Sequence, residues 1–320
     1  MKKIVTLLII ILASSVTAYA QQYPSRPVRM IVPAGPGSGA DAVARIIALR
    51  LSERLGQQVV VDNRPGAAAN IATEIASKAA PDGYTLLIIS PSVAINASLY
   101  SKLNYDLVRD FAPISLVTTG QYVVVTHPSL PTKTIKEFIA LAKAKPGELV
   151  YASAGTGSLS HVGVELFSSM AGVKMLHVPY KGGGPALIDL ISGQVQMHVS
   201  VVIAALPHIK SGRLRGLAVT GEQRSPAIPS LPTVAESGLA GFVLTTYNGI
   251  MAPEATPRII IERLNAEIVK VMQAPGMREH LVRDGAVPFG STPDEFAALL
   301  KSEITKWSKV VKALGLRAID

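Results

Sequence analysis

Short apolar runs alternate along the chain with longer segments whose apolar residues recur every three or four positions. Such runs predict β-strands at 28–32, 58–61 and 85–89. Between the first two strands, helical spacing continues until Gly56 and is carried by Val43, Ile46, Ile47, Leu51 and Leu55. A second helix is predicted over 67–80, which Pro81, Asp82 and Gly83 end. The first ninety residues therefore predict strands and helices in alternation.

The alternation continues through the second half of the chain. A strand is predicted at 149–152 and a helix at 159–170, and the last third of the chain is mostly amphipathic helix. Two helix starts fit the capping-box pattern, Thr134 with Glu137 and Thr292 with Glu295. Alternating strands and helices are typical of an α/β fold whose parallel sheets are covered by helices on both faces.

The first twenty residues have the features of an export signal. Lys2 and Lys3 precede a mostly apolar run at 4–12, and Ala18 and Ala20 form a small-x-small cleavage site. The run is shorter than the roughly 20 residues that span a bilayer, although a retained membrane anchor remains an alternative. We therefore expect cleavage near Ala20 and a protein that works in the periplasm.

Composition and charge exclude several functions. The chain has 320 residues and no cysteine, which excludes disulfides, a thiol nucleophile and cysteine-based metal sites. The formal net charge of +9 falls to +7 when Lys2 and Lys3 leave with the export signal. Lysines and arginines are scattered and aromatic residues make up only 5%, whereas nucleic-acid surfaces combine a basic stripe with stacking aromatics. A nucleic-acid partner is therefore not expected.

Two glycine-rich loops, each between a predicted strand and a predicted helix, are the best candidates for a binding site. The first contains Gly35, Pro36, Gly37 and Ser38 before Asp41, and the second contains Gly155, Thr156, Gly157 and Ser158. Small residues let a ligand approach the backbone, and the N–H groups at a helix start favour a negative charge. Two such loops could hold a carboxylate or phosphate across a cleft, although either alone is equally compatible with a turn that binds nothing.

The first loop also fits a different function. Gly37-x-Gly39-x-x-Ala42 matches the dinucleotide-binding fingerprint, and Asp62 ends the second strand at about the expected distance. This motif alone would indicate a nucleotide-dependent dehydrogenase, but nicotinamide cofactors are chiefly cytoplasmic and the chain has an export signal. Other enzyme signatures are missing from the sequence: it has no P-loop, no nucleophile elbow and no metal-ligand spacing among its six histidines.

Two more side chains are candidates for the same cleft. His161 lies at the predicted start of the helix after the second loop, where Ser160 is its neighbour rather than a catalytic partner. Tyr180 and Lys181 precede a run of three glycines. Both residues could line the cleft. Equally compatible with the sequence is a tyrosine in the core and an exposed lysine.

Seven motifs, in one order along the chain, resemble the extracytoplasmic solute receptors of the tripartite tricarboxylate transporter family, also called Bug proteins. The motifs are IVP…G-x-G-x-D-x-x-AR at 31–45, VDNRPGA at 61–67, PDGYTL at 81–86, YASAGTGS at 151–158, VPYKG at 178–182, GQV at 193–195 and PSLPTV-x-E-x-G at 229–238. The resemblance covers nearly the whole chain after the export signal.

The resemblance implies a two-lobed periplasmic-binding-protein clamshell of the α/β class, similar to type II, with a parallel or mixed sheet flanked by helices in each lobe. It places 21–121 plus 246–320 in lobe 1 and 122–245 in lobe 2. The ligand would be a small carboxylate gripped largely by backbone amides and waters, with no catalytic residue, cofactor or metal. The expected site residues are Ala34, Gly35, Pro36, Gly37, Ser38, Asp41, Ser90, Ser92, Ala154, Gly155, Thr156, Gly157, Ser158, His161, Tyr180 and Ser200.

Several positions depart from the family pattern. Ala34 stands where an aromatic residue is usual, Val93 where a histidine is frequent and Ser200 where an aspartate is frequent. The positions at which this chain replaces common glycines are Ser38, Ala68 and Ala69. The loss of the aromatic residue and of the histidine predicts a larger and less polar pocket, which would suit a bulkier or more apolar acid.

The resemblance also implies partners. A monomeric receptor would close around its ligand and deliver it to the integral-membrane permease subunits of a tripartite transporter. Two alternatives remain open: a sensory receptor that presents the ligand to a signalling protein, and the exported dinucleotide-binding enzyme described above.

Overall fold

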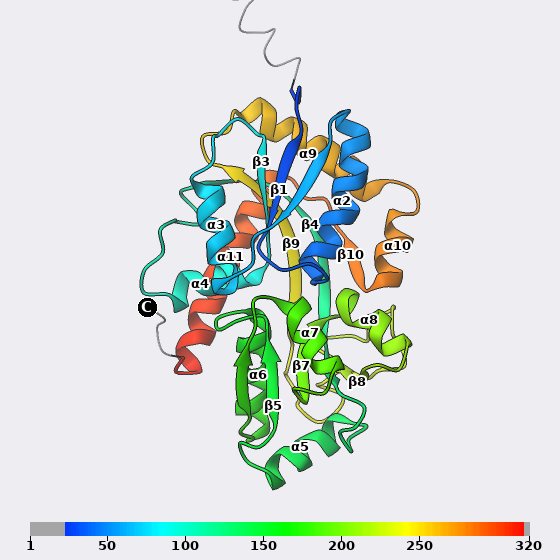
Figure 1. The fold of residues 1–320 in the computed structure, drawn as a ribbon. Helices are drawn as coiled ribbons and strands as arrows, with labels where there is room; N and C mark the ends of the chain where they lie inside the picture. The colour runs from blue at the N-terminus through cyan, green and yellow to red at the C-terminus, as the bar shows by residue number, and fades with distance from the viewer. Residues whose placement is uncertain (1–22, 317–320) are drawn as a thin grey trace, which may run out of the picture.

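Two mixed sheets share one long strand. The structure, a computed structural model, describes residues 23–316, so the predicted export signal lies outside the described residues. The first sheet consists, in spatial order, of β2 (Val59–Asn63), β1 (Val28–Val32), β3 (Thr85–Ile89), β9 (Thr245–Pro253), β4 (Phe111–Thr126) and β10 (Ala286–Pro288). The second consists of β6 (Leu176–Pro179), β5 (Val150–Ser153), β7 (Met197–Val201), β4 and β8 (Arg215–Val219). We call the parts built on these sheets lobe 1 and lobe 2 (Figure 1).

Helices cover both sheets. Around the first sheet lie α2 (Gly39–Leu55), η1 (Ala67–Ala69), α3 (Asn70–Ser77), α4 (Pro91–Leu99), α9 (Arg258–Gln273), α10 (Met277–Asp284) and α11 (Pro293–Ala313). Around the second lie α5 (Ile135–Ala144), α6 (Leu159–Ala171), α7 (Gly183–Ile191) and α8 (Val202–Lys210). Successive residues of β1 enter different apolar clusters, Met30 on one face of the sheet and Ile31 on the other. The predicted α/β fold, with a helix-flanked sheet in each lobe, is confirmed.

Several predicted element boundaries are confirmed. β1 and β3 coincide with the predicted strands, and α2 ends at Gly56, which has a left-handed φ of 66°. Thr292 caps α11 with a complete capping box, because its side chain accepts from the N–H of Glu295 and the Glu295 carboxylate accepts from the N–H of Thr292.

The helix predicted over 67–80 is wrong in its first turn. Three successive alanines, Ala67, Ala68 and Ala69, have φ values of 44°, 49° and 90°, and α3 begins only at Asn70. Alanine favours right-handed helix, so this backbone is held by its surroundings rather than by local preference. One such contact is the buried Asn96 side chain, whose Nδ2 donates to the carbonyl oxygen of Ala68 at 2.7 Å.

The two lobes are joined where β4 changes partners. It pairs with β9 as far as Gln121 and with β7 from Tyr122 onwards. Thr220 ties the two connections together: its N–H donates to the carbonyl of Tyr122, and its Oγ1 donates to the carbonyl of Leu244 at 2.6 Å. The lobe boundaries drawn from the sequence, 21–121 plus 246–320 and 122–245, stay a prediction.

A shared apolar cluster joins the lobes on one side. Leu99 of α4 and Trp307 and Val311 of α11 lie in the same buried cluster as Phe138 and Phe167 of lobe 2. The C-terminal part of α11 thus reaches from lobe 1 toward lobe 2 (Figure 1). Within residues 23–316, no helix combines the length and apolar character that a membrane span requires.

Candidate functional site

A cavity lies between the lobes, and the N-terminal ends of five helices border it. Its lining includes residues at the starts of α2, α4, α6, α7 and α8, which are Gly39, Ser90, Ser158, Gly183 and Val201. Each helix N-terminus carries a partial positive charge and N–H groups without helical partners. Five of them around one cavity make a site for an anion.

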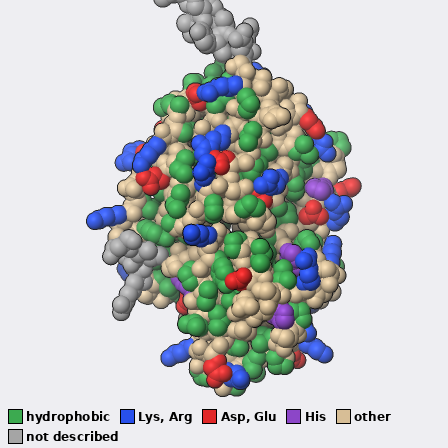
Figure 2. Space-filling model, in the orientation of Figure 1, with side chains coloured by type: hydrophobic (Ala, Val, Ile, Leu, Met, Phe, Trp, Pro, Cys, Tyr) green, Lys and Arg blue, Asp and Glu red, His purple; other side chains and the backbone are tan. Residues whose placement is uncertain are grey.

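The described lining contains no Lys, Arg, Asp or Glu side chain. An anion there would be held by neutral hydrogen-bond donors and helix dipoles. Over the face of the molecule in Figure 2, Lys and Arg are scattered rather than gathered into a stripe, as the sequence predicts. No group of three His, Asp or Glu residues within 23–316 is arranged to hold a metal ion.

Seven of the sixteen predicted site residues line the cavity directly. They are Ala34, Ser38, Ser90, Ser92, Ala154, Ser158 and Ser200. Two of the departures from the family pattern, Ala68 and Ala69, line it as well. Val93, in contrast, is fully buried in the core of lobe 1 and is absent from this lining, so its difference from histidine does not act on the cavity surface directly.

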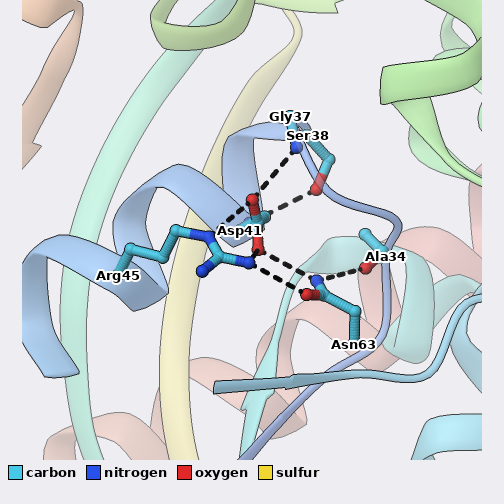
Figure 3. Close-up of polar contacts among 6 residues, drawn as sticks. All are labelled: Ala34, Gly37, Ser38, Asp41, Arg45 and Asn63. Carbon is cyan, nitrogen blue, oxygen red and sulfur yellow. Dashed lines mark hydrogen bonds and ion pairs between the residues drawn. The ribbon is translucent and has the colours of Figure 1, made fainter. Parts of the chain in front are cut away.

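The first glycine-rich loop is held from within lobe 1 (Figure 3). Ser38 caps α2 by accepting from the N–H of Asp41, and the Asp41 carboxylate accepts from the N–H of Gly37 at 3.0 Å. Asn63 of β2 donates to Asp41 at 2.9 Å and to the carbonyl of Ala34 at 2.8 Å. Asp41 therefore fixes the loop and does not itself line the cavity.

The partners of Asp41 stabilise its ionised form. Burial alone would raise the pKa of its carboxyl group, but hydrogen bonds from Arg45, Asn63 and the Gly37 N–H outweigh this and hold the pKa below its usual range. Arg45 also forms an ion pair with it at 3.0 Å. The charge needed to shape the first loop is thus neutralised outside the cavity.

The second glycine-rich loop has the same cap geometry with a different side chain. Ser158 caps α6 by accepting from the N–H of His161, and His161 Nδ1 accepts from the N–H of Gly157 at 3.2 Å. The ring of His161 stacks on that of His177, with centroids 4.2 Å apart. Burial lowers the pKa of His161, so the ring is neutral at neutral pH and Nδ1 is free to accept.

Most N–H groups of the second loop are already used inside the protein. The N–H of Ala154 donates to Ser160 Oγ, that of Gly155 donates to Ser153 Oγ, and that of Leu159 donates to Ser92 Oγ. In contrast, no acceptor within 23–316 pairs with the N–H of Gly39, Ala40 or Ser160, and these three residues line the cavity. Within these two loops, the donors available to an anion are therefore the N–H groups of Gly39, Ala40 and Ser160, in the first turns of α2 and α6.

The other predicted residues lie beside the cavity rather than in its lining. Those that shape the loops or pack between the lobes are Gly35, Pro36, Gly37, Asp41, Gly155, Thr156, Gly157 and His161. Tyr180 also lies outside the lining, and its hydroxyl donates to Asp189 at 2.7 Å.

Each loop also touches the opposite lobe. A Cβ on Gly182 would come within 3.1 Å of the backbone nitrogen of Gly35, and one on Gly184 would come within 2.4 Å of the carbonyl oxygen of Pro36. On the other side, the Tyr100 hydroxyl donates to the carbonyl of Thr156 at 3.3 Å. The structure is therefore one in which the lobes meet on both sides of the cavity.

Sequence reasoning missed the end of the cavity nearest the connections between the lobes. Thr118 and Gln121 of β4 face it together with Thr246 and Asn248 of β9, and Asn248 donates to Thr118 Oγ1 at 2.9 Å. These residues come together only through the pairing of two strands far apart in sequence. His198 of β7 was also missed, although it lies in the same short strand as the predicted Ser200.

Comparisons with known proteins agree on one family. A family model described as "Tripartite tricarboxylate transporter family receptor" matches residues 43–316. The protein BugT of Bordetella pertussis is 40% identical over 300 residues, which cover 93% of this chain and 92% of BugT.

Two solved structures extend the likeness to three dimensions. Rpa4515 of R. palustris with adipate superposes with a TM-score of 0.91 at 35% identity, covering 93% of this chain and all of that one. MatC (Rpa3494) from Rhodopseudomonas palustris with bound malate gives a TM-score of 0.86 at 32% identity, covering 90% of this chain and all of that one. The α/β fold is thus that of periplasmic binding proteins of this group.

Proposed function

The chain belongs to the family of tripartite tricarboxylate transporter receptors, and from this premise we propose that it captures a small carboxylate between its lobes for delivery to membrane permease subunits. The family is one of solute-binding proteins and not of enzymes. The dinucleotide-binding alternative for the first loop is therefore not retained. Export through the signal at 1–20, with cleavage near Ala20, and a monomeric receptor are parts of the same proposal.

The observation that carries the proposal is the convergence of five helix N-termini on an uncharged cavity. Free N–H groups of Gly39, Ala40 and Ser160 come from both lobes, so one carboxylate could bridge them and favour the closed arrangement. Neutral donors suit an anion that must be released again, because no buried opposite charge is left unpaired when the ligand leaves.

The ligands of two relatives support a proposal about the size of the ligand. Rpa4515 was solved with adipate and MatC with malate, which are dicarboxylic acids of six and four carbons. In this chain, Ala34 and Ser200 line the cavity with small side chains where the family pattern has an aromatic residue and an aspartate. We propose that the ligand is a carboxylic acid at least as bulky as these dicarboxylates.

The test is binding by the mature chain, starting at Gln21. Thermal shift and calorimetry with C4 to C6 dicarboxylates, tricarboxylates, aromatic acids and amino acids should identify an acid that stabilises the protein, and small-angle scattering should show compaction with it. Stabilisation by a small polar dicarboxylate alone would contradict the expected bulk of the ligand. No effect of any acid would contradict the function itself.

Ser38 offers a matched pair of variants. Asp and Asn are both good helix caps, so Ser38→Asp and Ser38→Asn should both keep the start of α2. Only Ser38→Asp places a negative charge in the cavity lining, and we expect it to bind the acid at least tenfold more weakly than Ser38→Asn. Equal affinities would show that the anion is bound elsewhere.

A further inference from the structure

His198 is a buried polar side chain in the cavity lining. It lies on β7, is only 2% exposed and borders the cavity together with Gly183 at the start of α7. Its Nδ1 is 2.9 Å from the carbonyl oxygen of Ala152 on the neighbouring strand β5. Because a carbonyl oxygen can only accept, Nδ1 carries the proton.

This bond determines what the other ring nitrogen can do. Burial lowers the pKa of His198 to about 4, so the ring is neutral at neutral pH and has one proton, which is on Nδ1. Nε2 is then an unprotonated acceptor. It lies on the side of Gly183, whose missing Cβ would be 4.0 Å away, and no residue within 23–316 donates a hydrogen bond to it.

The cavity therefore offers a ligand two chemically different kinds of group. The first turns of α2 and α6 offer N–H donors, which suit a carboxylate. Nε2 of His198 offers a lone pair, which repels a carboxylate oxygen and needs an O–H or N–H group in front of it. An acceptor that the bound ligand cuts off from water without giving it a partner is unfavourable, so a ligand that closes the cavity without such a group would lose affinity.

The geometry points to a ligand that carries a hydrogen-bond-donating hydroxyl or amino group besides its carboxylate, with His198 Nε2 as the acceptor of that hydrogen bond. This inference rests on the proposed function and narrows its substrate class from carboxylates in general to hydroxy or amino acids. His198 acts as a residue that determines specificity, since it selects among acids of the same carbon skeleton.

The test compares acids that differ by one group. The C4 set is succinate, malate and aspartate, and the C6 set is adipate, 2-hydroxyadipate and 2-aminoadipate. In whichever set binds, the hydroxyl or amino acid should bind at least about tenfold more tightly than the parent acid. Comparison of the hydroxyl acid with the amino acid then tells which group is preferred. Equal affinities of all three members would overturn the inference and leave the proposed function standing. If neither set binds, the same comparison is made with the parent, hydroxyl and amino forms of the acid that the wider panel identifies, and no binding by any acid would remove both.

Two variants separate the acceptor from the structural role of His198. His198→Phe and His198→Gln both lose the bond from Nδ1 to Ala152, but the side-chain oxygen of glutamine can stand where Nε2 stands. We expect His198→Phe to bind all three members within about threefold of one another, and His198→Gln to restore most of the preference. A preference that survives in His198→Phe, or falls equally in both variants, would overturn the inference.

A spectroscopic measurement completes the test. In the ¹⁵N spectrum of imidazole-labelled protein, His198 should show a protonated Nδ1 and an unprotonated Nε2, and only the preferred acids should shift the Nε2 resonance toward that of a hydrogen-bonded acceptor. A proton on Nε2 in the free protein would contradict the assignment.

Discussion

The two glycine-rich loops have the same cap geometry but differ in chemistry. In lobe 1 the residue three positions after the serine cap is Asp41, and in lobe 2 it is His161; each reaches back to the N–H of the glycine before the cap. Asp41 accepts as an anion that Arg45 and Asn63 support, whereas His161 accepts as a neutral ring. One geometry can thus be held by a charge or by a proton-sensitive lone pair.

The loops also differ in what surrounds their glycines. Gly37 and Gly157 have similar positive φ values, 78° and 89°. A Cβ on Gly37 would meet nothing within 4 Å, whereas one on Gly157 would lie 3.0 Å from both Asn96 Oδ1 and Leu99 Cδ2 of α4. The second loop therefore meets the opposite lobe at the glycine that its cap network holds, whereas the first loop meets it at Gly35 and Pro36 instead. We expect Gly157 to be more sensitive than Gly37 to conditions that oppose closure.

Low pH should have the largest effect on stability and should affect the two loops differently. Burial lowers the pKa of His177 and of His198 to about 4 and lowers that of His161, so the unfolded chain binds more protons than the folded one between pH 6.5 and 4. Stability is then complete above pH 6.5 and is lost as the pH falls below it. Between pH 7 and 5 we expect urea titrations to show a loss of about 2 kcal/mol for each of His177 and His198.

Hydrogen exchange can follow the effect of low pH at each loop separately. In a series from pH 7 to pH 4, hydrogen exchange corrected for intrinsic rates should show the protection of the Gly157 N–H falling as the pH falls through the lowered pKa of His161, because a protonated Nδ1 can no longer accept. The Gly37 N–H should keep its protection, since the lowered pKa of Asp41 leaves the carboxylate ionised there. Equal loss of protection at both glycines would contradict the comparison.

Removing the charge from the first loop should have the next largest effect. Asp41→Ala leaves the Gly37 N–H without its acceptor and leaves Arg45 without its carboxylate partner, and we expect a loss of about 2–3 kcal/mol in the free energy of unfolding. Arg45 is more than half exposed, which keeps the loss below that of a fully buried pair. Asp41→Asn, which keeps an oxygen near Gly37, should lose about half as much, and an unchanged urea midpoint in both variants would show that the network contributes nothing.

Alanine at the two glycines tests the difference in their surroundings. Gly157→Ala adds a clash with α4 to the strain of its positive φ, so it should weaken ligand binding roughly thirtyfold, or about 2 kcal/mol. Gly37→Ala adds only the backbone strain, about 1 kcal/mol of stability, and should leave affinity nearer that of the wild type. Calorimetry and urea unfolding of both variants give the two quantities separately. If Gly157→Ala and Gly37→Ala bind the ligand with similar affinity, contact between the second loop and α4 plays no part in closure.

Features that depend only on neighbouring residues are predicted best from the sequence. The strands at 28–32 and 85–89, the helix stop at Gly56 and both glycine-rich loops depend on neighbouring residues, and each appears at its predicted place. Lining residues such as Thr118 and Asn248 depend on the pairing of β4 with β9, which no local pattern encodes. The role of His198 cannot be predicted from neighbouring residues, because it depends on one hydrogen bond to a neighbouring strand.

The prediction of a helix over 67–80 is wrong in its first turn because contacts from elsewhere in the chain determine the backbone there. Alanine after alanine favours a right-handed helix, but the left-handed backbone here places Ala68 against the second loop: a Cβ on Gly155 would lie 3.6 Å from the backbone nitrogen of Ala68. Tertiary contacts with Asn96 of lobe 1 and with the second loop, which the local sequence does not contain, therefore outweigh helix propensity.

This strained segment supplies the smallest of the expected effects. Ala67 is exposed, so Ala67→Gly should relieve its positive φ without losing packing and raise stability by up to about 1 kcal/mol. Ala68 is buried and lines the cavity, so Ala68→Gly loses some apolar contact and should gain less. Urea titrations of the two variants measure this difference. If both destabilise the protein, the flexibility that glycine adds to the unfolded chain outweighs the strain, and the segment beside the second loop holds no stored energy that ligand closure could use.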